Sequence, residues 1–281
     1  SEQTRDIKYS ISPSELKTMN TEQIRGQILV PKVFEPGKAL LTYSFDERFI
    51  LGGICPLDRP VFLESADEIR QDYFLQTREM GVINIGGPGS ITADGEVFRL
   101  NYEDGAYLGC ETKEVTFSSD DPQAPAKFYV TSLLAFKKNP NCVILKDSAQ
   151  LNPCGSQEGA SSRIVKKYIY KGGPVKSNQL QMGINSVQPG NVWNTLPTHS
   201  HKRRVECFMY YNMHKDAFYI EVIGEPKESR HVIIRNEQAI VSAAWQMHFG
   251  VGTTHYDFIW AMGGENQDFP DMDVVPMEEI W

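Results

Sequence analysis

Short apolar runs rich in β-branched and aromatic residues recur along most of the chain, separated by turn-forming residues. Runs of this length and composition are typical of β-strands. Asp94-Gly95 lies inside one of them and favours a two-residue hairpin turn there. The expected strands lie in residues 48–54, 81–87, 90–100, 127–136, 166–173, 218–224, 231–241 and 256–262. Since no long helical period separates them, the pattern predicts an all-β fold of sandwich or barrel type.

The N-terminal part departs from this pattern. Ser12 can cap a helix, Pro13 suits its first position, and Glu15 can complete a capping box. The segment TEQIRGQIL follows as a second short helical candidate. We therefore expect short helices within residues 12–28, ahead of the main body.

Residues 137–162 break the strand rhythm with Pro, Asn, Gly and Ser. Such a composition indicates a connection between domains. We expect a first domain over residues 1–145 and a second over residues 146–281.

The two halves can be set against each other through REMGVINIG and RVECFMYYN. In this pairing Glu79 matches Glu206, while Asp72 and Phe74 stand where the second half has His199 and His201. The chain is then a duplicated barrel whose first copy has lost the ligands discussed below. Glu79 is expected to be an ordinary structural carboxylate.

Composition and net charge limit the kinds of molecule that the protein is expected to bind. The chain has 281 residues, 41% of them hydrophobic, which is enough for a sizeable core. Its net charge of −8 argues against a nucleic-acid or anionic-membrane surface, because both require a basic face. No run approaches the roughly 18 apolar residues of a membrane span. We expect small-molecule or protein partners, with no nucleic acid and no membrane.

The N-terminus SEQTRDIKYS lacks the apolar core of a signal peptide. The five cysteines are odd in number, scattered, and form no C-x-x-C pair. Neither a disulfide framework nor a zinc finger is therefore indicated. These features fit a protein of the reducing cytoplasm.

The stretch THSHKRRVE carries the strongest candidate chemistry. On a strand, His199 and His201 point to one face with their Cα atoms roughly 7 Å apart. Glu206 has the opposite parity, so a bend or bulge in Lys-Arg-Arg must restore its direction. We expect a fourth ligand from another strand, and His248, just before a glycine-rich turn, is our choice.

Three imidazoles and one carboxylate suit a borderline divalent ion such as Zn, Fe, Mn, Ni or Co. Such a set leaves room for water or substrate at the metal. In the alternative interpretation, His199 and His201 are surface polar groups and His248 is a satisfied core histidine. We assign His214, His231 and His255 to structural or surface roles of that kind.

The arrangement H-x-H-x4-E followed by a distant histidine on a β-barrel resembles a cupin. Two features depart from the usual cupin motifs. Trp193 stands where a glycine is expected six residues before the first histidine, and Ala-Ala-Trp replaces the usual P-x-G before the last one.

Longer phrases resemble the 5-keto-4-deoxyuronate isomerase family over essentially the whole chain. These phrases are FLQTREMGVINIGGPGSITADG, PGNVWNTLPTHSHKRRVE, RHVIIRNEQAIVS and FIWAMGGENQDFPDMD. The resemblance implies two cupin-type jelly-roll barrels, with one zinc ion per subunit in the second barrel only. It also implies a hexamer. The family's zinc ligands carry over to His199, His201, Glu206 and His248.

The resemblance further implies an intracellular step in the use of unsaturated uronates from pectin and related polyuronates. The implied reaction converts 5-dehydro-4-deoxy-D-glucuronate to 3-deoxy-D-glycero-2,5-hexodiulosonate, an aldose-to-ketose isomerisation in which the carbonyl moves from C1 to C2. A metal would polarise the C1 carbonyl and the adjacent hydroxyl. No redox cofactor is required.

Two roles stay open at the level of sequence. The general base is not identified, with Glu206, Tyr256 and Lys167 as candidates. The substrate carboxylate calls for a cation, and Arg163 and Arg204 are the candidates.

Two other functions are compatible with the same ligands. An iron-dependent cupin dioxygenase would bind iron and consume oxygen. A non-catalytic sugar-binding cupin would bind its ligand without turnover. The acidic and apolar tail NQDFPDMDVVPMEEIW is expected to pack on the body of the protein or on a neighbouring subunit.

Overall fold

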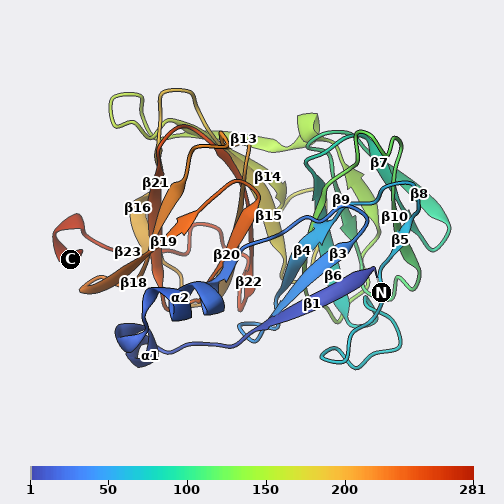
Figure 1. Cartoon of the computed structure of the whole chain (residues 1–281), viewed down its shortest axis with the longest axis horizontal. Helices are drawn as coiled ribbons and strands as arrows, with labels where there is room; N and C mark the ends of the chain where they lie inside the picture. The colour runs from blue at the N-terminus through green and yellow to red at the C-terminus, as the bar shows by residue number, and fades with distance from the viewer. Residues whose placement is uncertain (1) are drawn as a thin grey trace. The chain divides into compact units, whose positions relative to one another are not determined.

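The computed structural model describes residues 2–281, which divide into two compact units (Figure 1). The first unit contains residues up to 7, 33–149 and 168–181, and the second contains 8–32, 150–167 and 182–281. The sequence analysis placed a single boundary between residues 145 and 146. In the structure, residues 8–32 instead belong to the second unit and 168–181 to the first.

The first unit consists of two antiparallel sheets. The larger has the order β1 (Gln3–Lys8), β3 (Ala39–Ser44), β4 (Ile50–Ile54), β11 (Phe128–Leu134), β6 (Arg78–Asn84), β9 (Gly105–Leu108) and β12 (Cys142–Ile144). The smaller has the order β5 (Val61–Phe62), β10 (Val115–Ser119), β7 (Gly89–Ala93) and β8 (Glu96–Leu100). Side chains from both sheets, among them Val82, Val130 and Phe117, form one hydrophobic core.

The second unit repeats this plan. Its larger sheet has the order β13 (Gln150–Cys154), β14 (Arg163–Ile169), β15 (Gln181–Val187), β22 (Asp257–Gly264), β17 (Arg204–Tyr211), β20 (Gln238–Ser242) and β2 (Leu29–Val30). Its smaller sheet has the order β19 (Glu228–Ile234), β18 (Tyr219–Glu225), β21 (Met247–Gly252), β16 (Trp193–Ser200) and β23 (Asp273–Val274). Two single-turn helices, η1 (Lys146–Ser148) and η2 (Met277–Glu279), complete the assignment.

The helices and the first hairpin form for the reasons expected from sequence. Helices α1 (Pro13–Thr18) and α2 (Thr21–Ile28) each begin with a capping box, and Ser12 and Glu15 form the first box. Asp94 and Gly95 both adopt positive φ and connect β7 to β8. The predicted all-β class with short N-terminal helices is confirmed.

One of the expected strands was wrong, and the expected connection between domains is partly regular. Residues 231–241 form two strands, β19 and β20, separated by a turn in which Glu237 has a φ of 59°. Residues 137–162 contain the crossing from the first unit to the second, between residues 149 and 150, and also hold β12 and β13. Both strands lie at the edge of their sheets, where polar residues and Pro153 are tolerated because one side of the strand is unpaired.

The strand order also tests the proposed internal alignment. Strands β6 and β17 are both fifth in their seven-stranded sheets. Glu206 has the parity of Phe208, which is in the core of its unit, whereas Glu79 has the opposite parity to the core residue Met80. The pairing of Glu79 with Glu206 was therefore wrong by one residue, and such a shift exchanges the two faces of a strand.

Glu79 is nonetheless the structural carboxylate that the sequence predicted. Its side chain is completely buried and accepts a hydrogen bond from the Tyr107 hydroxyl at 2.6 Å. The backbone N–H groups of Asn178, Gln179 and Leu180 also donate to it, at 2.7, 2.9 and 3.0 Å. It thereby fixes residues 178–180 to β6.

We predict that Glu79→Ala lowers the free energy of unfolding by about 3 kcal/mol or more, because four donors, all of them buried or partly buried, lose their acceptor. Urea denaturation measures this change. Glu96→Ala, at an exposed position on β8, is the control and should change the value by less than about 0.5 kcal/mol. Metal content should be unaffected in both variants, and its loss in Glu79→Ala would contradict the structural role.

Candidate metal centre

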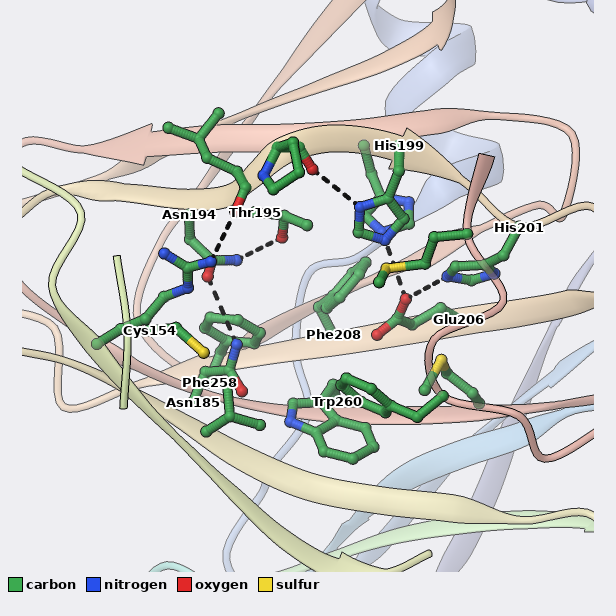
Figure 2. A pocket seen from close by; sticks show the side chains of 18 of the residues that line it. Cys154, Asn185, Asn194, Thr195, His199, His201, Glu206, Phe208, Phe258 and Trp260 are labelled. Atoms are coloured by element: carbon green, nitrogen blue, oxygen red, sulfur yellow. Dashed lines mark hydrogen bonds and ion pairs between the residues drawn. The ribbon is translucent and has the colours of Figure 1, made fainter. Parts of the chain in front are cut away.

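The second unit encloses a pocket of about 410 Å³, lined by residues from β13 to β17, β21 and β22 and from the segment that follows β22. His199, His201, Glu206 and His248 all line it. Figure 2 shows the labelled side chains of the pocket and the hydrogen bonds between them. The structure thus brings the four predicted ligands into one cavity.

The three histidines come from two neighbouring strands. His199 lies near the end of β16 and is paired in register with His248 on β21, while His201 follows directly after β16. One ring nitrogen of each histidine lies within 4.8 Å of the corresponding nitrogens of the other two. Among residues 2–281, they form the one group of three or more His, Cys, Asp or Glu ligand atoms at that spacing.

Glu206 reaches the same point through a turn. The Arg204 N–H donates to the His201 carbonyl at 2.9 Å, which closes the bend expected in Lys-Arg-Arg and starts β17. The Glu206 Oε2 then lies 2.7 Å from His201 Nε2 and 3.3 Å from His248 Nε2. Four potential ligands therefore converge from β16, β17 and β21.

Backbone carbonyls orient two of the imidazoles. His199 Nδ1 lies 3.0 Å from the Pro197 carbonyl, and His201 Nδ1 lies 2.9 Å from the Arg204 carbonyl. Because a carbonyl can only accept, each Nδ1 carries the proton and donates, which leaves a lone pair on the Nε2 of His199, while the Nε2 of His201 faces the Glu206 carboxylate. This is the tautomer in which a histidine binds a metal through Nε2.

The electrostatics differ between the imidazoles. Burial acts to lower the pKa of His201, but the hydrogen bond to Glu206 raises it above its ordinary value. Burial lowers the pKa of His199 to about 4, so this imidazole is neutral at pH 7. Burial opposes ionisation of Glu206, but hydrogen bonds from His201 and His248 hold the pKa of Glu206 below its usual range. Neutral imidazoles with an ionised carboxylate are the donor set that binds a borderline divalent cation. The residues present therefore fit such an ion.

The rest of the pocket combines an apolar wall with two cations. Phe208, Phe258 and Trp260 line it together with Val165 and Met262. Such a wall excludes water and strengthens electrostatic interactions inside the cavity.

Arg163 and Arg204, the two candidate carboxylate-binding residues, also line the pocket and are both buried. Arg163 donates to the carbonyls of Ser161 and Leu196 at 2.9 and 2.8 Å, and Arg204 donates to the Asp271 carbonyl at 2.6 Å. Burial lowers the pKa of both guanidinium groups. Within residues 2–281 no carboxylate oxygen forms a salt bridge with either arginine, so the pocket can accept an anion.

Two of the three candidate bases lie outside the pocket lining. The Tyr256 hydroxyl donates to the Val192 carbonyl at 3.0 Å. The Lys167 ammonium lies 3.9 Å from the centroid of the Phe269 ring. Of the three candidates, Glu206 is the one that lines the cavity.

The remaining histidines lie away from the cavity. His214 and His255 line a separate surface hollow, and His231 is exposed on β19. None of the three belongs to the cluster of ligand atoms.

The sequence analysis missed several lining residues, including Cys154, Asn185, Asn194, Phe269 and Met272. Cys154, Asn185 and Asn194 are small polar residues on strands and belong to no recognisable sequence motif. Phe269 and Met272 belong to the acidic and apolar tail, which was expected to pack on the body and does so. Arg203 binds Asp271 at 2.7 Å, and β23 pairs with the end of β16.

A second buried carboxyl lies in the core of the same unit, outside the pocket lining. Glu221 on β18 is 2% exposed and accepts a hydrogen bond from Tyr210 at 3.0 Å. Burial raises the pKa of Glu221 to about 8, although the hydroxyls of Tyr210 and Tyr219 partly stabilise its charge. The group is therefore largely protonated in the folded protein at neutral pH.

Among residues 2–281, no helix is long and apolar enough to cross a membrane.

The sequence matches the KduI/IolB family over residues 29–276. It is 45% identical over 275 residues to a 4-deoxy-L-threo-5-hexosulose-uronate ketol-isomerase of Caldicellulosiruptor bescii, covering 98% of this chain and 99% of the relative. It is also 45% identical to the protein of that name from Lacticaseibacillus paracasei, covering 97% of both chains. The similarity therefore extends over nearly the whole length of both relatives.

Solved structures share the fold at much lower identity. An IolB-like protein from Salmonella typhimurium matches with a TM-score of 0.70 and 12% identity, covering 88% of this chain and 96% of that one. Oxalate decarboxylase from Lactobacillus farciminis matches with a TM-score of 0.52 and 12% identity, covering 78% of each chain. These matches support the cupin-type architecture and carry no information on activity.

We predict that His248→Ala lowers the metal content of the purified protein, because it removes one of three convergent imidazoles. Elemental analysis measures metal per subunit. His231→Ala, on an exposed part of β19, is the matched control and should retain the metal content of the unmodified protein. Equal metal content in both variants would remove His248 from the ligand set.

We predict that Glu221→Gln becomes more stable relative to the unmodified protein as pH rises. In the folded unmodified protein, Glu221 keeps a proton that the unfolded chain releases near the ordinary pKa of about 4.5. The free energy of unfolding of the unmodified protein therefore falls between about pH 4.5 and about pH 8. A glutamine loses no proton and avoids this fall. Urea denaturation across this range tests the effect, with exposed Glu225→Gln on the same strand as control. Parallel stability curves for Glu221→Gln and the unmodified protein would contradict the prediction.

Proposed function

The chain belongs to the KduI/IolB family, and on this premise we propose that it is a metal-dependent ketol-isomerase of uronate catabolism. The proposed substrate is 5-dehydro-4-deoxy-D-glucuronate, which is another name for 4-deoxy-L-threo-5-hexosulose uronate. The proposed product is 3-deoxy-D-glycero-2,5-hexodiulosonate. The carbonyl moves from C1 to C2, and no net oxidation occurs.

The observation that carries this proposal is the composition of the pocket. Three imidazoles and an ionisable carboxylate face a cavity that also holds two arginines without carboxylate partners among residues 2–281. A sugar acid presents the two complementary features, a carbonyl with an adjacent hydroxyl and a carboxylate. Near-complete coverage of relatives that carry the isomerase name supports the same assignment.

We propose Zn²⁺ as the cofactor, one ion per subunit, held by His199, His201, Glu206 and His248. When bound there, the ion would supply Lewis-acid polarisation of the C1 carbonyl and the C2 hydroxyl. The chemistry of the donor set supports a borderline divalent ion, and its four members leave room for substrate oxygens.

Proton transfer is the task of the protein's own side chains. The C2–H bond breaks and a C1–H bond forms, while the hydroxyl proton moves from the C2 oxygen to the C1 oxygen. We propose that Glu206 takes the proton from C2 and delivers it to C1, because Glu206 lines the cavity whereas Tyr256 and Lys167 do not. The wall of Phe208, Phe258 and Trp260 limits exchange of this proton with water.

At least one of Arg163 and Arg204 is proposed to bind the substrate carboxylate. The assignment of metal to the second unit alone stays a prediction. So do the cytoplasmic location, the hexameric assembly and the origin of the substrate in pectin or related polyuronates.

We predict that the zinc-loaded protein transfers the carbonyl of this substrate from C1 to C2. The substrate can be generated with a polyuronate lyase, and NMR follows the loss of the C1 aldehyde hydrate and the appearance of the C2 ketone. Removal of metal by a chelator should abolish turnover, and added Zn²⁺ should restore it. Glu206→Gln should lower kcat by about a hundredfold or more, because one side chain supplies both a ligand and the base.

Two other experimental outcomes would indicate a different function. Substrate binding without turnover by the metal-loaded protein would indicate a sugar-binding protein. Bound iron with oxygen consumption would indicate a dioxygenase.

A further inference from the structure

The pocket has two polar ends separated by an aromatic wall. Figure 2 shows Asn185 and Asn194 toward one side and His201 and Glu206 toward the other, with the ring of Phe208 between them. All of these side chains line the same cavity. The two ends are termed here the amide end and the histidine end.

Strand pairing gives the separation of the two ends. Asn194 on β16 is paired with Gly250 on β21, and His199 is paired with His248. The two positions on β21 are two residues apart, which corresponds to roughly 7 Å. An extended six-carbon chain has five C–C bonds and spans roughly 6 Å. A six-carbon acid can therefore contact both ends at once.

The two arginines lie at opposite ends. Arg163 is paired in register with Cys154 at the edge of the larger sheet, and Figure 2 shows Cys154 on the side of Asn185 and Asn194. Arg204 lies two residues before Glu206 on β17 and shares its face, and its carbonyl accepts from His201. Arg163 thus belongs to the amide end and Arg204 to the histidine end.

A bulge in β16 fixes Arg163 relative to the histidines. The register between β16 and β21 shifts between Asn194 and His199, and Thr195, Leu196 and Pro197 within this stretch line the pocket. The Leu196 carbonyl accepts from Arg163, and the next carbonyl, that of Pro197, accepts from the ring of His199. Successive carbonyls of this bulge therefore orient the guanidinium and an imidazole together.

The cavity also holds polar groups that the protein itself does not satisfy. Within residues 2–281, the Trp260 Nε1–H and the Asn185 Oδ1 are buried and have no hydrogen-bond partner. Trp260 is only 2% exposed. A buried polar group without a partner is costly, and a polar ligand atom in the pocket removes the cost.

We propose that Arg163 is the carboxylate-binding residue and that the substrate lies with its keto-acid end at the amide end and its reacting C1 and C2 at the histidine end. Trp260 Nε1–H then donates to the keto oxygen next to the carboxylate. Arg204 faces the reacting oxygens and does not bind the carboxylate. This inference rests on the proposed function and orients its substrate within the pocket.

The test compares two substrates, the six-carbon keto acid and its neutral C6 carboxamide. A charge-assisted pair favours the acid, so we expect the unmodified protein to prefer it by about ten- to a hundredfold in kcat/KM. Arg163→Met should reduce this preference to about one, and Arg163→Lys should restore part of it. Arg204→Met should lower kcat/KM for both substrates and keep the preference. Exposed Arg235→Met is the control for loss of one positive charge.

The proposal would be overturned if Arg204→Met lost the preference for the acid over the carboxamide while Arg163→Met kept it. That result would assign the carboxylate to Arg204. Metal content and the thermal midpoint of each variant show whether the site is still assembled. If Arg163→Met does not fold, the preference of Arg163→Lys for the acid is the deciding measurement. A preference of Arg163→Lys equal to that of the unmodified protein would then count against the proposal.

A binding measurement separates this inference from the proposed function. 2-Oxobutanoate carries the same keto-acid end and has no C1 aldehyde to isomerise. In calorimetry, the affinity for 2-oxobutanoate should fall about tenfold or more in Arg163→Met and by a smaller factor in Trp260→Phe. The affinity of Arg204→Met should equal that of the unmodified protein. Equal affinity in Arg163→Met and the unmodified protein would overturn the inference. If the full substrate is not turned over at all, the isomerase proposal fails while this measurement still decides the role of Arg163.

Discussion

The second unit depends on one constraint, the burial of the Glu206 carboxylate among imidazoles. Glu206 is 7% exposed, and the protein groups at its Oε2 are the Nε2 atoms of His201 and His248. A buried carboxylate requires compensation by hydrogen bonds or by positive charge. Here the same nitrogens that compensate it are the ones available to a cation. The arrangement that keeps the carboxylate ionised therefore also assembles the ligand set.

The two units show how one sheet architecture can hold either a core or a site. Their seven-stranded sheets place β6 and β17 at the same position in the strand order. In the first unit, inward positions such as Met80 and Val82 carry apolar side chains that pack with the opposite sheet. In the second, Glu206 and His248 occupy inward positions near one end, and the apolar residues continue beyond them. Filling with apolar side chains stabilises the first interior, whereas the polar groups keep the second one open to a ligand.

Segments outside the regular sheet pairing complete the pocket. The bulge of β16 supplies the Leu196 and Pro197 carbonyls that orient Arg163 and His199. The segment after β22 brings Phe269 and Met272 to the cavity and is fixed by the bidentate contact of Arg203 with Asp271. The carbonyl of Asp271 also accepts from Arg204. The bulge and the segment after β22 thus orient the two arginine side chains, and the bulge also orients His199.

The sequence by itself determined the class of fold and singled out four residues that the structure brings into one pocket. Alternating apolar runs, the Asp94-Gly95 turn and the Ser12 capping box act over a few residues, so their consequences can be read locally. The spacing of His199 and His201 on a strand likewise fixes that they share a face. The tertiary structure decided what depends on contacts between distant strands. These include the pairing of His248 with His199, the face on which Glu79 lies, the exclusion of Tyr256 and Lys167 from the cavity, and the amide end with Asn185 and Asn194. Such features follow from sheet register and loop closure, and a one-residue change in register, invisible in the sequence, exchanges the two faces of a strand.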